Sequence, residues 1–158
     1  AFGNSAYAQG YINNNDAIVA SNSLTRTTHS YLASNDTMYA SNICEMVSKN
    51  EKKNLIFKLC MQLDGNLVLY KVMNNLDQQG QILWATNTGG SGANRAVMQS
   101  DGNFVLYKPN GIAVWASNTP SANQSVLMLH PDGNLTVSYI HYMDSIPTYF
   151  HKWETGTN

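Results

Sequence analysis

Hydrophobic residues recur at every second position in short runs along most of this chain, and turn sequences separate the runs. The clearest run follows Asp64-Gly65, where Leu67 and Leu69 alternate with Val68 and Tyr70. An alternation with a period of two places the apolar residues on one face of a strand and the others on the opposite face. No stretch combines a 3.6-residue apolar period with helix caps. The pattern therefore predicts an all-β protein.

The strongest runs belong to an internal repeat of three copies. Two copies are nearly identical, and a third is weaker: M-Q-L-D-G-N-L-V-L-Y from Met61, M-Q-S-D-G-N-F-V-L-Y from Met98 and L-H-P-D-G-N-L-T-V-S from Leu129. Each copy precedes a tryptophan phrase: W-A-T-N-T from Trp84, W-A-S-N-T from Trp115 and W-E-T-G-T from Trp153. Self-similarity of this kind indicates a fold built from repeated units.

Each copy predicts a three-stranded antiparallel meander. Asp-Gly between two alternating runs is a strong hairpin signal, and it predicts a two-residue primed turn at Asp64-Gly65, with equivalent turns at Asp101-Gly102 and Asp132-Gly133. In the first copy a second turn at Asn74-Asn75 and Gln79-Gly80 leads to a strand over 82–86. The second copy predicts strands over 96–99, 103–107 and 112–117. The third predicts strands over 126–130, 134–139 and 150–155, with a longer connection before the last one.

One meander cannot bury its apolar face alone, because isolated hairpins are marginally stable in water. Three meanders packed around a common axis can bury it. The side chains expected in the shared centre are the alternating aliphatic residues and the tryptophans: Leu67, Leu69, Leu106, Leu135, Val137, Trp84, Trp115 and Trp153. The outer faces would then carry the polar residues of the repeat.

A smaller repeat lies upstream of the three copies. The segments N-D-A-I-V-A-S-N-S-L from Asn15 and N-D-T-M-Y-A-S-N-I-C from Asn35 share the N-D and A-S-N positions. Either segment is a candidate for the outer strand that opens the domain. The second lies nearer the first meander, so we expect a repeat domain over 35–158 and an N-terminal extension of undetermined role over 1–34.

Composition excludes several classes of partner. The length of 158 residues fits one domain with a sizeable core. A net charge of −1 and 12% charged residues give no electrostatic reason to expect nucleic acid or an acidic membrane surface. No apolar run approaches the roughly 20 residues that span a bilayer. We therefore expect no nucleic-acid partner and no membrane insertion.

No motif predicts catalysis, a metal site or a cofactor. The four histidines are scattered, without the H-x-H, H-E-x-x-H or C-x-x-C spacing of metal sites: His29, His130, His141 and His151. The chain also lacks a G-x-S-x-G nucleophile elbow. Solvated or packed histidines account for all four, so we expect a protein that is not an enzyme and needs no cofactor.

The two cysteines, Cys44 and Cys60, bear on the compartment. They either form a disulfide, which would stabilise the chain by about 3 kcal/mol, or remain two buried thiols. A bridge would indicate an oxidising compartment. The first residues, A-F-G-N-S-A-Y, lack the basic flank and apolar stretch of a signal peptide, so a secreted protein is expected here in mature form. We expect a secreted, extracellular protein.

The motif Gln-x-Asp-x-Asn-x-Val-x-Tyr, repeated with W-A-S-N-T phrases, resembles the monocot mannose-binding lectins, the snowdrop-type or bulb-type lectins. Two copies match every position: Gln62, Asp64, Asn66, Val68 and Tyr70, then Gln99, Asp101, Asn103, Val105 and Tyr107. The resemblance covers about residues 35–158. It implies a type II β-prism of three four-stranded antiparallel sheets with pseudo-threefold symmetry. It also implies metal-independent binding of mannose-type sugars, with one site for each intact motif.

The residue types suit a sugar. A hexopyranose presents hydroxyls that both donate and accept, so its site needs mixed donors and acceptors. Gln62 and Asn66 supply both through their amides, and Asp64 accepts hydroxyl protons in charge-assisted bonds. Tyr70 offers a phenol, and Val68 offers a small apolar floor for the C–H face of the ring. The hairpin brings these side chains together from two strands.

The third copy departs from the motif. His130 replaces the glutamine, Thr136 replaces the valine and Ser138 replaces the tyrosine, whereas Asp132 and Asn134 remain. The turn is kept and most of the recognition set is lost. We therefore predict two intact sites and a degenerate third, in which His130 would make any residual binding pH-dependent. The cysteines also depart, because the slot where plant members commonly place a cysteine holds Gly65.

The scaffold alone leaves other roles open. Lectin-like bacteriocins and other defence proteins, taste-modifying proteins and sugar-blind structural relatives share it. The intact motifs favour an agglutinin-type lectin whose partners are mannose-containing glycans or glycoproteins, and they do not separate recognition from delivery for killing. Because shallow single sites are weak, we expect a homodimer that exchanges C-terminal strands and so gains avidity. Residues 1–34 would either mediate or block that exchange.

Overall fold

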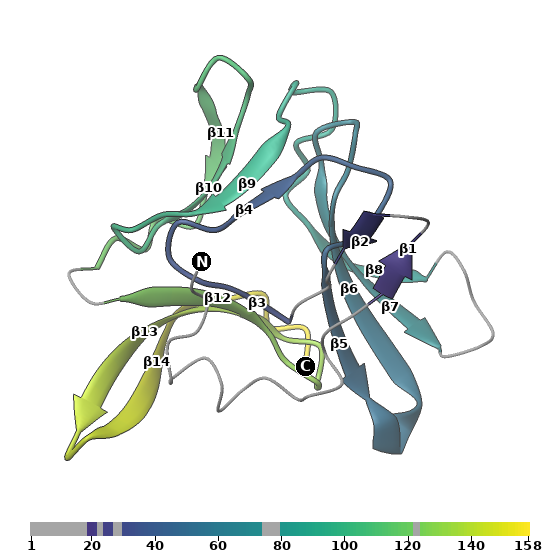
Figure 1. Ribbon diagram of the computed structural model, residues 1–158. Helices are drawn as coiled ribbons and strands as arrows, with labels where there is room; N and C mark the ends of the chain where they lie inside the picture. Colours follow the sequence, from purple (N-terminus) through teal and green to yellow (C-terminus); the bar gives the residue numbers. More distant parts are fainter. Residues whose placement is uncertain (1–18, 22–23, 27–29, 74–79, 122–123) are drawn as a thin grey trace.

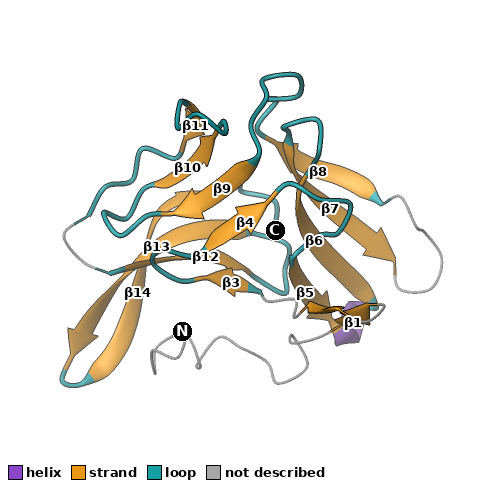
Figure 2. Ribbon diagram, turned by 45° about the horizontal axis from the view of Figure 1, so that its top comes forward, coloured by secondary structure: helices purple, strands orange, loops and turns teal. Residues whose placement is uncertain are grey.

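Three β-sheets lie around a common centre in the computed structural model, which describes residues 19–21, 24–26, 30–73, 80–121 and 124–158 (Figure 1). Strands and loops make up nearly all of the described chain (Figure 2). The exception is a short 3-10 helix, η1 (Glu51–Lys53). No helix within the described ranges is long and apolar enough to cross a membrane. The prediction of an all-β prism is confirmed.

Each copy of the repeat forms one antiparallel sheet with a fourth strand from upstream. The first sheet has the order β5 (Met46–Asn50), β6 (Leu55–Met61), β7 (Leu67–Met73) and β8 (Gln81–Ala85). The second consists of β4 (Thr37–Tyr39), β9 (Arg95–Met98), β10 (Phe104–Tyr107) and β11 (Ala113–Ala116). The third consists of β3 (Tyr31–Leu32), β12 (Ser125–Leu129), β13 (Leu135–Met143) and β14 (Ile146–Glu154). The predicted turn at Asn74-Asn75 lies outside the described residues.

The segment 31–50 supplies the outermost strand of every sheet in turn. β3 pairs with β12, β4 pairs with β9, and β5 pairs with β6. The Asn35 segment therefore contributes β4, as one of the two alternatives predicted. The division into 1–34 and 35–158 stays a prediction, and β3 lies on the N-terminal side of it. Most of the Asn15 segment lies outside the described residues, apart from β1 (Val19–Ser21), which pairs with β2 (Leu24–Arg26).

The Asp-Gly turns differ from the predicted two-residue primed turns. Gly65 donates its backbone N–H to the carbonyl of Gln62 at 3.0 Å, so Leu63 and Asp64 form the centre of the turn. Primed turns need positive φ in their centre, whereas here the positive φ of +92° falls on Gly65, after the turn. A turn followed by a left-handed glycine is the three-residue hairpin with a G1 bulge. Gly102 and Gly133 repeat this geometry.

These glycines also allow the copies to pack on one another. A Cβ at Gly133 would lie 2.5 Å from the ring of Phe57 in the first copy, and a Cβ at Gly102 would lie 2.8 Å from Ser125 Oγ in the third. A Cβ at Gly65 would lie 3.2 Å from the backbone of Ala93, which precedes β9. The turn of the first copy therefore contacts the second copy, the turn of the second contacts the third, and the turn of the third contacts the first.

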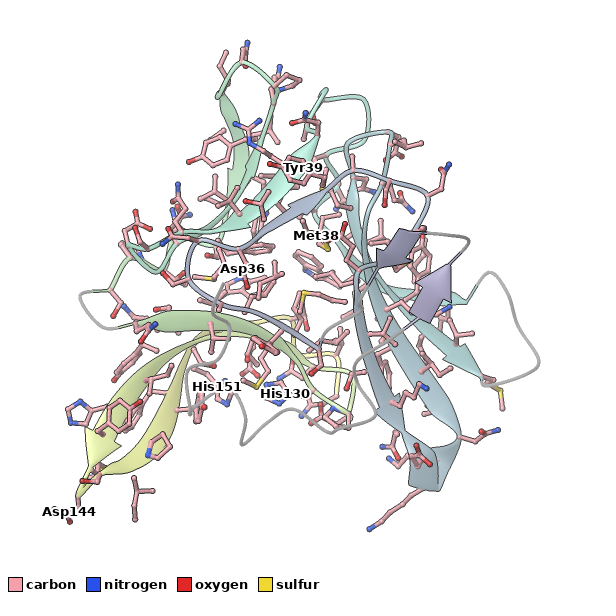
Figure 3. The ribbon with its side chains drawn as sticks, in the orientation of Figure 1. Asp36, Met38, Tyr39, His130, Asp144 and His151 are labelled. Carbon is pink, nitrogen blue, oxygen red and sulfur yellow. A yellow bond between two sulfur atoms is a disulfide. The ribbon has the colours of Figure 1, made fainter. Side chains whose placement is uncertain are left out.

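The last hairpin is longer than predicted. The expected long connection after residue 139 is wrong, because β13 and β14 stay paired out to Met143 and Ile146. Asp144 and Ser145 join them with φ values of 50° and 67°. Two consecutive positive φ angles are typical of a type I′ turn, which suits the twist of a two-residue hairpin. Asp144 lies at the tip of this hairpin, away from the body of the prism (Figure 3).

The core lies where the three sheets meet. The fully buried side chains include the predicted leucines and several methionines: Leu67, Leu69, Leu106, Leu135, Val137, Met38, Met46, Met61 and Met98. Trp84, Trp115 and Trp153 pack against this core and contact one another edge to face, with ring centroids 5.4–5.7 Å apart. The prediction of a shared centre is confirmed.

Candidate functional site

A β-bulge at the same place in every sheet sets the position of the motif tyrosines. In the first sheet Leu69 pairs with Trp84 and Tyr70 pairs with Ile82, so Leu83 is the extra residue. The register shifts at the equivalent place beside Tyr107 and beside Ser138. A bulge increases the local twist and redirects the neighbouring side chain. In each copy the bulge therefore lies directly before the position of the motif tyrosine.

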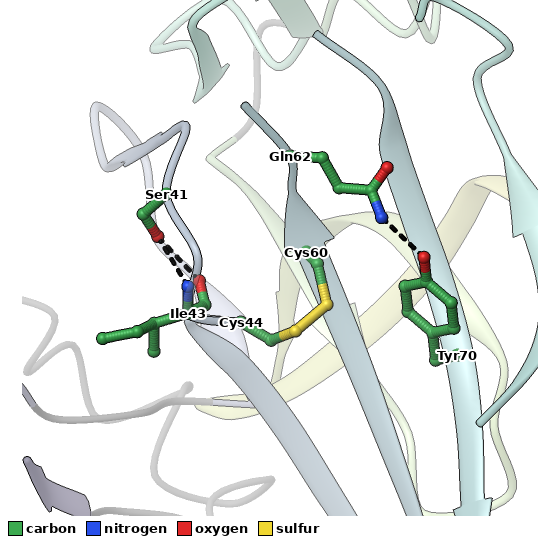
Figure 4. Close-up of a disulfide and its surroundings, with 6 residues drawn as sticks. All are labelled: Ser41, Ile43, Cys44, Cys60, Gln62 and Tyr70. Atoms are coloured by element: carbon green, nitrogen blue, oxygen red, sulfur yellow. Dashed lines mark hydrogen bonds between the residues drawn. A yellow bond between two sulfur atoms is a disulfide. The ribbon is translucent and has the colours of Figure 1, made fainter. Parts of the chain in front are cut away.

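The five predicted residues of the first site lie together on the outer face of the first sheet. Gln62 follows β6, Asp64 lies in the turn, Asn66 precedes β7, and Val68 and Tyr70 lie on β7. Gln62 Nε2 donates to Tyr70 Oη at 2.5 Å (Figure 4). Asp64 Oδ1 accepts from the backbone N–H of Asn66 at 2.9 Å, which leaves Oδ2 without a hydrogen bond from a described residue.

Asn66 uses its side chain in two ways. Its Oδ1 accepts from Thr86 Oγ1 at 3.1 Å and from the backbone N–H of Thr88 at 3.2 Å. Thr88 Oγ1 in turn donates to the carbonyl of Gly65 at 2.7 Å. The oxygen therefore fixes the segment after the tryptophan phrase. The Nδ2 group has no partner among the described residues and remains available to a ligand.

The second site repeats this arrangement on the second sheet. Gln99 Nε2 donates to Tyr107 Oη at 2.6 Å, and Asp101 Oδ1 accepts from the backbone of Asn103 at 2.9 Å. Asn103 Oδ1 accepts from Ser117 Oγ and Thr119 N–H, both at 3.2 Å. Val105, like Val68, is almost fully buried beneath the site. The structure thus brings together all ten residues predicted for the two intact motifs.

In the third copy the asparagine nitrogen, Nδ2, has a carboxylate partner. Asn134 Oδ1 accepts from Thr155 Oγ1 at 3.1 Å and Gly156 N–H at 3.0 Å, as in the other copies. Its Nδ2, however, donates to Glu154 Oε2 at 2.6 Å. The tryptophan phrases place Ala85 and Ala116 where the third copy has Glu154. The sequence showed this glutamate in W-E-T-G-T, but its contact with Asn134 depends on the register of β13 and β14.

A chain of hydrogen bonds replaces the rest of the third motif. His130 Nε2 lies 2.9 Å from Thr136 Oγ1, which lies 3.2 Å from Ser138 Oγ, and Ser138 Oγ lies 3.0 Å from His151 Nδ1. Thr136 and Ser138 are fully buried, whereas the tyrosines of the intact motifs are half-buried. Figure 3 shows His130 and His151 side by side, and their ring centroids are 5.7 Å apart.

Burial lowers the pKa of His130 from its ordinary value, because the imidazolium loses hydration. The negative charge of Asp132 opposes this shift, the neighbouring His151 reinforces it, and Glu154 opposes it. No feature of the sequence indicates that His151 belongs to this cluster, since the bulge after Val137 decides which residue of β14 faces Ser138. In the described ranges no group of three His, Cys, Asp or Glu side chains is placed to hold a metal ion.

The cysteines form a disulfide between Cys44 and Cys60, with Cα atoms 4.2 Å apart. This decides between the two alternatives that the sequence left open. Cys60 lies on β6, two residues before Gln62 (Figure 4). Its cross-strand partner on β7 is Val68. The bridge therefore ties the segment before β5 to the strand that leads into the first site.

Comparisons with known proteins identify similar chains. No family model matches the chain. A mannose-specific lectin of Galanthus nivalis is 46% identical over 55 residues, which are 34% of this chain and 31% of that protein. The match thus spans about a third of the curated relative.

Solved structures match over most of the chain. The fold is similar to monomeric monocot mannose-binding lectins from Gastrodia elata, with 30% identity, a TM-score of 0.58 and coverage of 82% of this chain and 98% of that chain. It is also similar to a Polygonatum cyrtonema lectin complexed with monomannoside, with 26% identity, a TM-score of 0.54 and coverage of 82% and 97%.

Proposed function

Because this chain belongs to the monocot mannose-binding lectin family, we propose that it binds mannose-containing glycans at two sites. The sites lie on the outer faces of the first and second sheets. The observation that supports the proposal most directly is the hydrogen bonding of the asparagine side-chain nitrogen in each copy. This nitrogen, Nδ2, has no partner among the described residues in the two intact copies and donates to Glu154 in the third.

Members of this family are lectins, which bind carbohydrate and do not catalyse a reaction, and this chain is likewise not an enzyme. The proposed sites recognise sugar hydroxyls directly. Asn66 Nδ2 is a donor, Asp64 Oδ2 is a charged acceptor, and Tyr70 Oη accepts from Gln62 while keeping its own proton to donate. The carboxylate accepts while the phenol and Asn66 Nδ2 donate, so the site supplies both roles that a sugar hydroxyl needs. We therefore propose that binding requires no metal.

The sharpest test transfers the third-copy glutamate into the intact copies. Ala85→Glu should close the first site and Ala116→Glu the second. Each new carboxylate would accept a hydrogen bond from the asparagine Nδ2, which is then no longer available to the sugar. Truncating Asn66 itself is a poorer test, since its Oδ1 also fixes Thr86 and Thr88. The third copy shows that a glutamate at this position is compatible with the fold.

The measurement is an NMR titration with methyl α-D-mannopyranoside in the presence of EDTA. We expect two equivalents for the wild type, one for each single variant and none for the double variant, all with unchanged thermal unfolding. Glu154→Ala serves as the control and should keep two equivalents, because the third copy still lacks its glutamine, valine and tyrosine. A wild type that binds no mannoside, or binds only with added calcium, would overturn the proposal. So would a folded double variant that still binds.

We also propose that the protein acts in an extracellular or other oxidising compartment. The Cys44–Cys60 disulfide supports this, because such bridges persist where thiols are not kept reduced. Fractionation of the source tissue with thiol trapping tests it. A cytosolic protein with reduced cysteines would contradict it.

Exchange of C-terminal strands in a homodimer stays a prediction. In the single chain β14 pairs with β13 of the same chain from Thr136–Glu154 to Met143–Ile146. Two sites on one chain would already cross-link two glycans, so agglutination does not require the dimer. Light scattering at several concentrations decides the oligomeric state. A mass of one chain throughout would contradict the exchange.

A further inference from the structure

A cation stands directly beside the second proposed site. Arg95 on β9 is the cross-strand partner of Tyr107 on β10, so both side chains project from the outer face of the sheet. The guanidinium carbon lies 5.3 Å from the centre of the Tyr107 ring. Tyr107 is the residue that accepts the Gln99 hydrogen bond. The positive charge is therefore one side chain away from the proposed sugar.

The charge of Arg95 is fixed in place and is not neutralised by an acid. Its Nη1 donates to Asn94 Oδ1 at 3.2 Å and to the carbonyl of Lys108 at 2.8 Å. These two acceptors and the Tyr107 ring are its contacts in the described part of the chain, and none is a carboxylate. The remaining N–H groups of the planar fork can bind an anion. Because the guanidinium is already held, little rotamer entropy remains to be lost on binding.

The two copies with an intact motif have a cation at this position, and the third copy does not. In the first copy the partner of Tyr70 is Lys58, again a cation four residues before the motif glutamine. In the third copy the partner of Ser138 is Val126, which is buried. The chain has only nine lysines and arginines in 158 residues, so a cation beside both intact motifs is a specific feature. A neutral mannose unit would not need it.

An exposed aromatic ring extends the second site alone. Tyr39 on β4 is the next cross-strand partner of Arg95, and its side chain is 56% exposed. Figure 3 shows Tyr39 on the outer side of β4, opposite the inward Met38. The equivalent residue of the first copy is Val47, the partner of Lys58. The row Tyr39, Arg95 and Tyr107 therefore offers a ring face and a guanidinium beyond the motif.

We propose that the second site binds mannosyl glycans that carry an anionic group, namely a phosphate, a sulfate or a carboxylate, and that Arg95 binds this group. The proposal rests on the proposed function, because the sugar bound by the motif places the anion. Arg95 suits such a ligand because its fork matches phosphate and carboxylate oxygens in paired hydrogen bonds. Lys58 would act on the first site as a weaker point charge.

The test uses the Ala85→Glu variant, in which only the second site is open. Affinities are measured by calorimetry for methyl α-D-mannopyranoside, for its monophosphates at each ring hydroxyl, for the matching sulfates, and for a disaccharide of mannose and glucuronic acid. We expect at least one anionic ligand to bind about 10- to 100-fold more tightly than the neutral one, as a charge-assisted hydrogen bond implies. The gain should shrink as salt rises from 0.05 to 0.5 M.

Arg95→Gln in the same background should reduce the ratio of anionic to neutral affinity to about one, and Arg95→Lys should restore part of it. Lys58→Gln is the matched control, because it lies beside the closed site, and it should leave the ratio unchanged. If Arg95 only supports the loop, Arg95→Gln would change the anionic and the neutral affinity by the same factor and leave their ratio unchanged. That result would overturn the inference. So would competition by inorganic phosphate that is as effective as the best sugar phosphate.

The outcomes separate this inference from the proposed function. If the neutral mannoside binds and no anionic ligand binds better, the inference alone is wrong. If the neutral mannoside does not bind at all, the proposed function fails first.

Discussion

The second and third copies of the repeat share one backbone and differ in what their asparagine binds. In both, the side-chain oxygen holds the segment that follows the tryptophan phrase. In the second copy the nitrogen of Asn103 has no partner among the described residues, and in the third the nitrogen of Asn134 donates to Glu154. One side chain can therefore serve the scaffold through its oxygen and, in the proposed sites, bind sugar through its nitrogen. In the third copy the oxygen keeps this scaffold role although the nitrogen is bound to a carboxylate.

The largest effect should come from the part that the copies share. Leu67 and Leu135 hold the same repeat position, and both are fully buried. Leu67→Ala and Leu135→Ala should each lower the free energy of unfolding by about 2–5 kcal/mol, because each leaves a cavity in the common core. Urea unfolding monitored by tryptophan fluorescence measures this. A third-copy variant with a loss below about 1 kcal/mol would show that the degenerate copy has also left the shared core.

The disulfide distinguishes the first copy from the other two. Cys44→Ser with Cys60→Ser should lower the free energy of unfolding by about 3 kcal/mol, because the bridge closes a loop with a sequence separation of 16. At temperatures where the variant is folded, the second site should bind mannoside as in the wild type. Calorimetry on the variant that also carries Ala85→Glu checks this. Loss of binding at the second site would mean that the copies are not held independently.

A smaller effect should expose the scaffold role of the asparagines. Asn103→Ala and Asn134→Ala should each cost about 1–3 kcal/mol, because Ser117 and Thr119, or Thr155 and Gly156, lose their acceptor. Only Asn103→Ala should also reduce mannoside binding. Unfolding and titration experiments on the same preparations separate the two effects. Equal loss of binding in both variants would mean that the third copy binds sugar too.

The smallest effect concerns pH and the third copy alone. Burial lowers the pKa of His130, so the unfolded chain binds more protons than the folded chain between the two pKa values. The contribution of this group to stability is therefore complete above the unfolded value of about 6.5 and declines as the pH falls toward the folded value. His130→Gln, the residue of the intact copies, should remove this slope. Urea unfolding at pH 7.5 and pH 5.0 tests it, and an unchanged slope in the variant would assign the pH dependence to other groups.

The repeat made the fold and the positions of the motif residues predictable. Alternation placed Leu67 and Leu69 inward and Val68 and Tyr70 outward, because side chains on a strand point to opposite faces in turn. The motif residues are close in sequence and lie on one hairpin, so local geometry was enough to bring them together. The turn type was predicted wrongly, because Asp-Gly also suits a turn that places its glycine one position later.

Contacts between segments far apart in sequence were not predictable. The sequence by itself determined three similar β units, two complete recognition motifs and a third that lacks three of its five residues. Only the tertiary structure decided that β3, β4 and β5 complete the three sheets in turn, and that a bulge places Ser138 beside His151. It also decided that Glu154 binds the Asn134 amide. The physical reason is register, because the partner of a strand residue depends on how two separate strands align, and a shift of one residue turns each side chain to the other face.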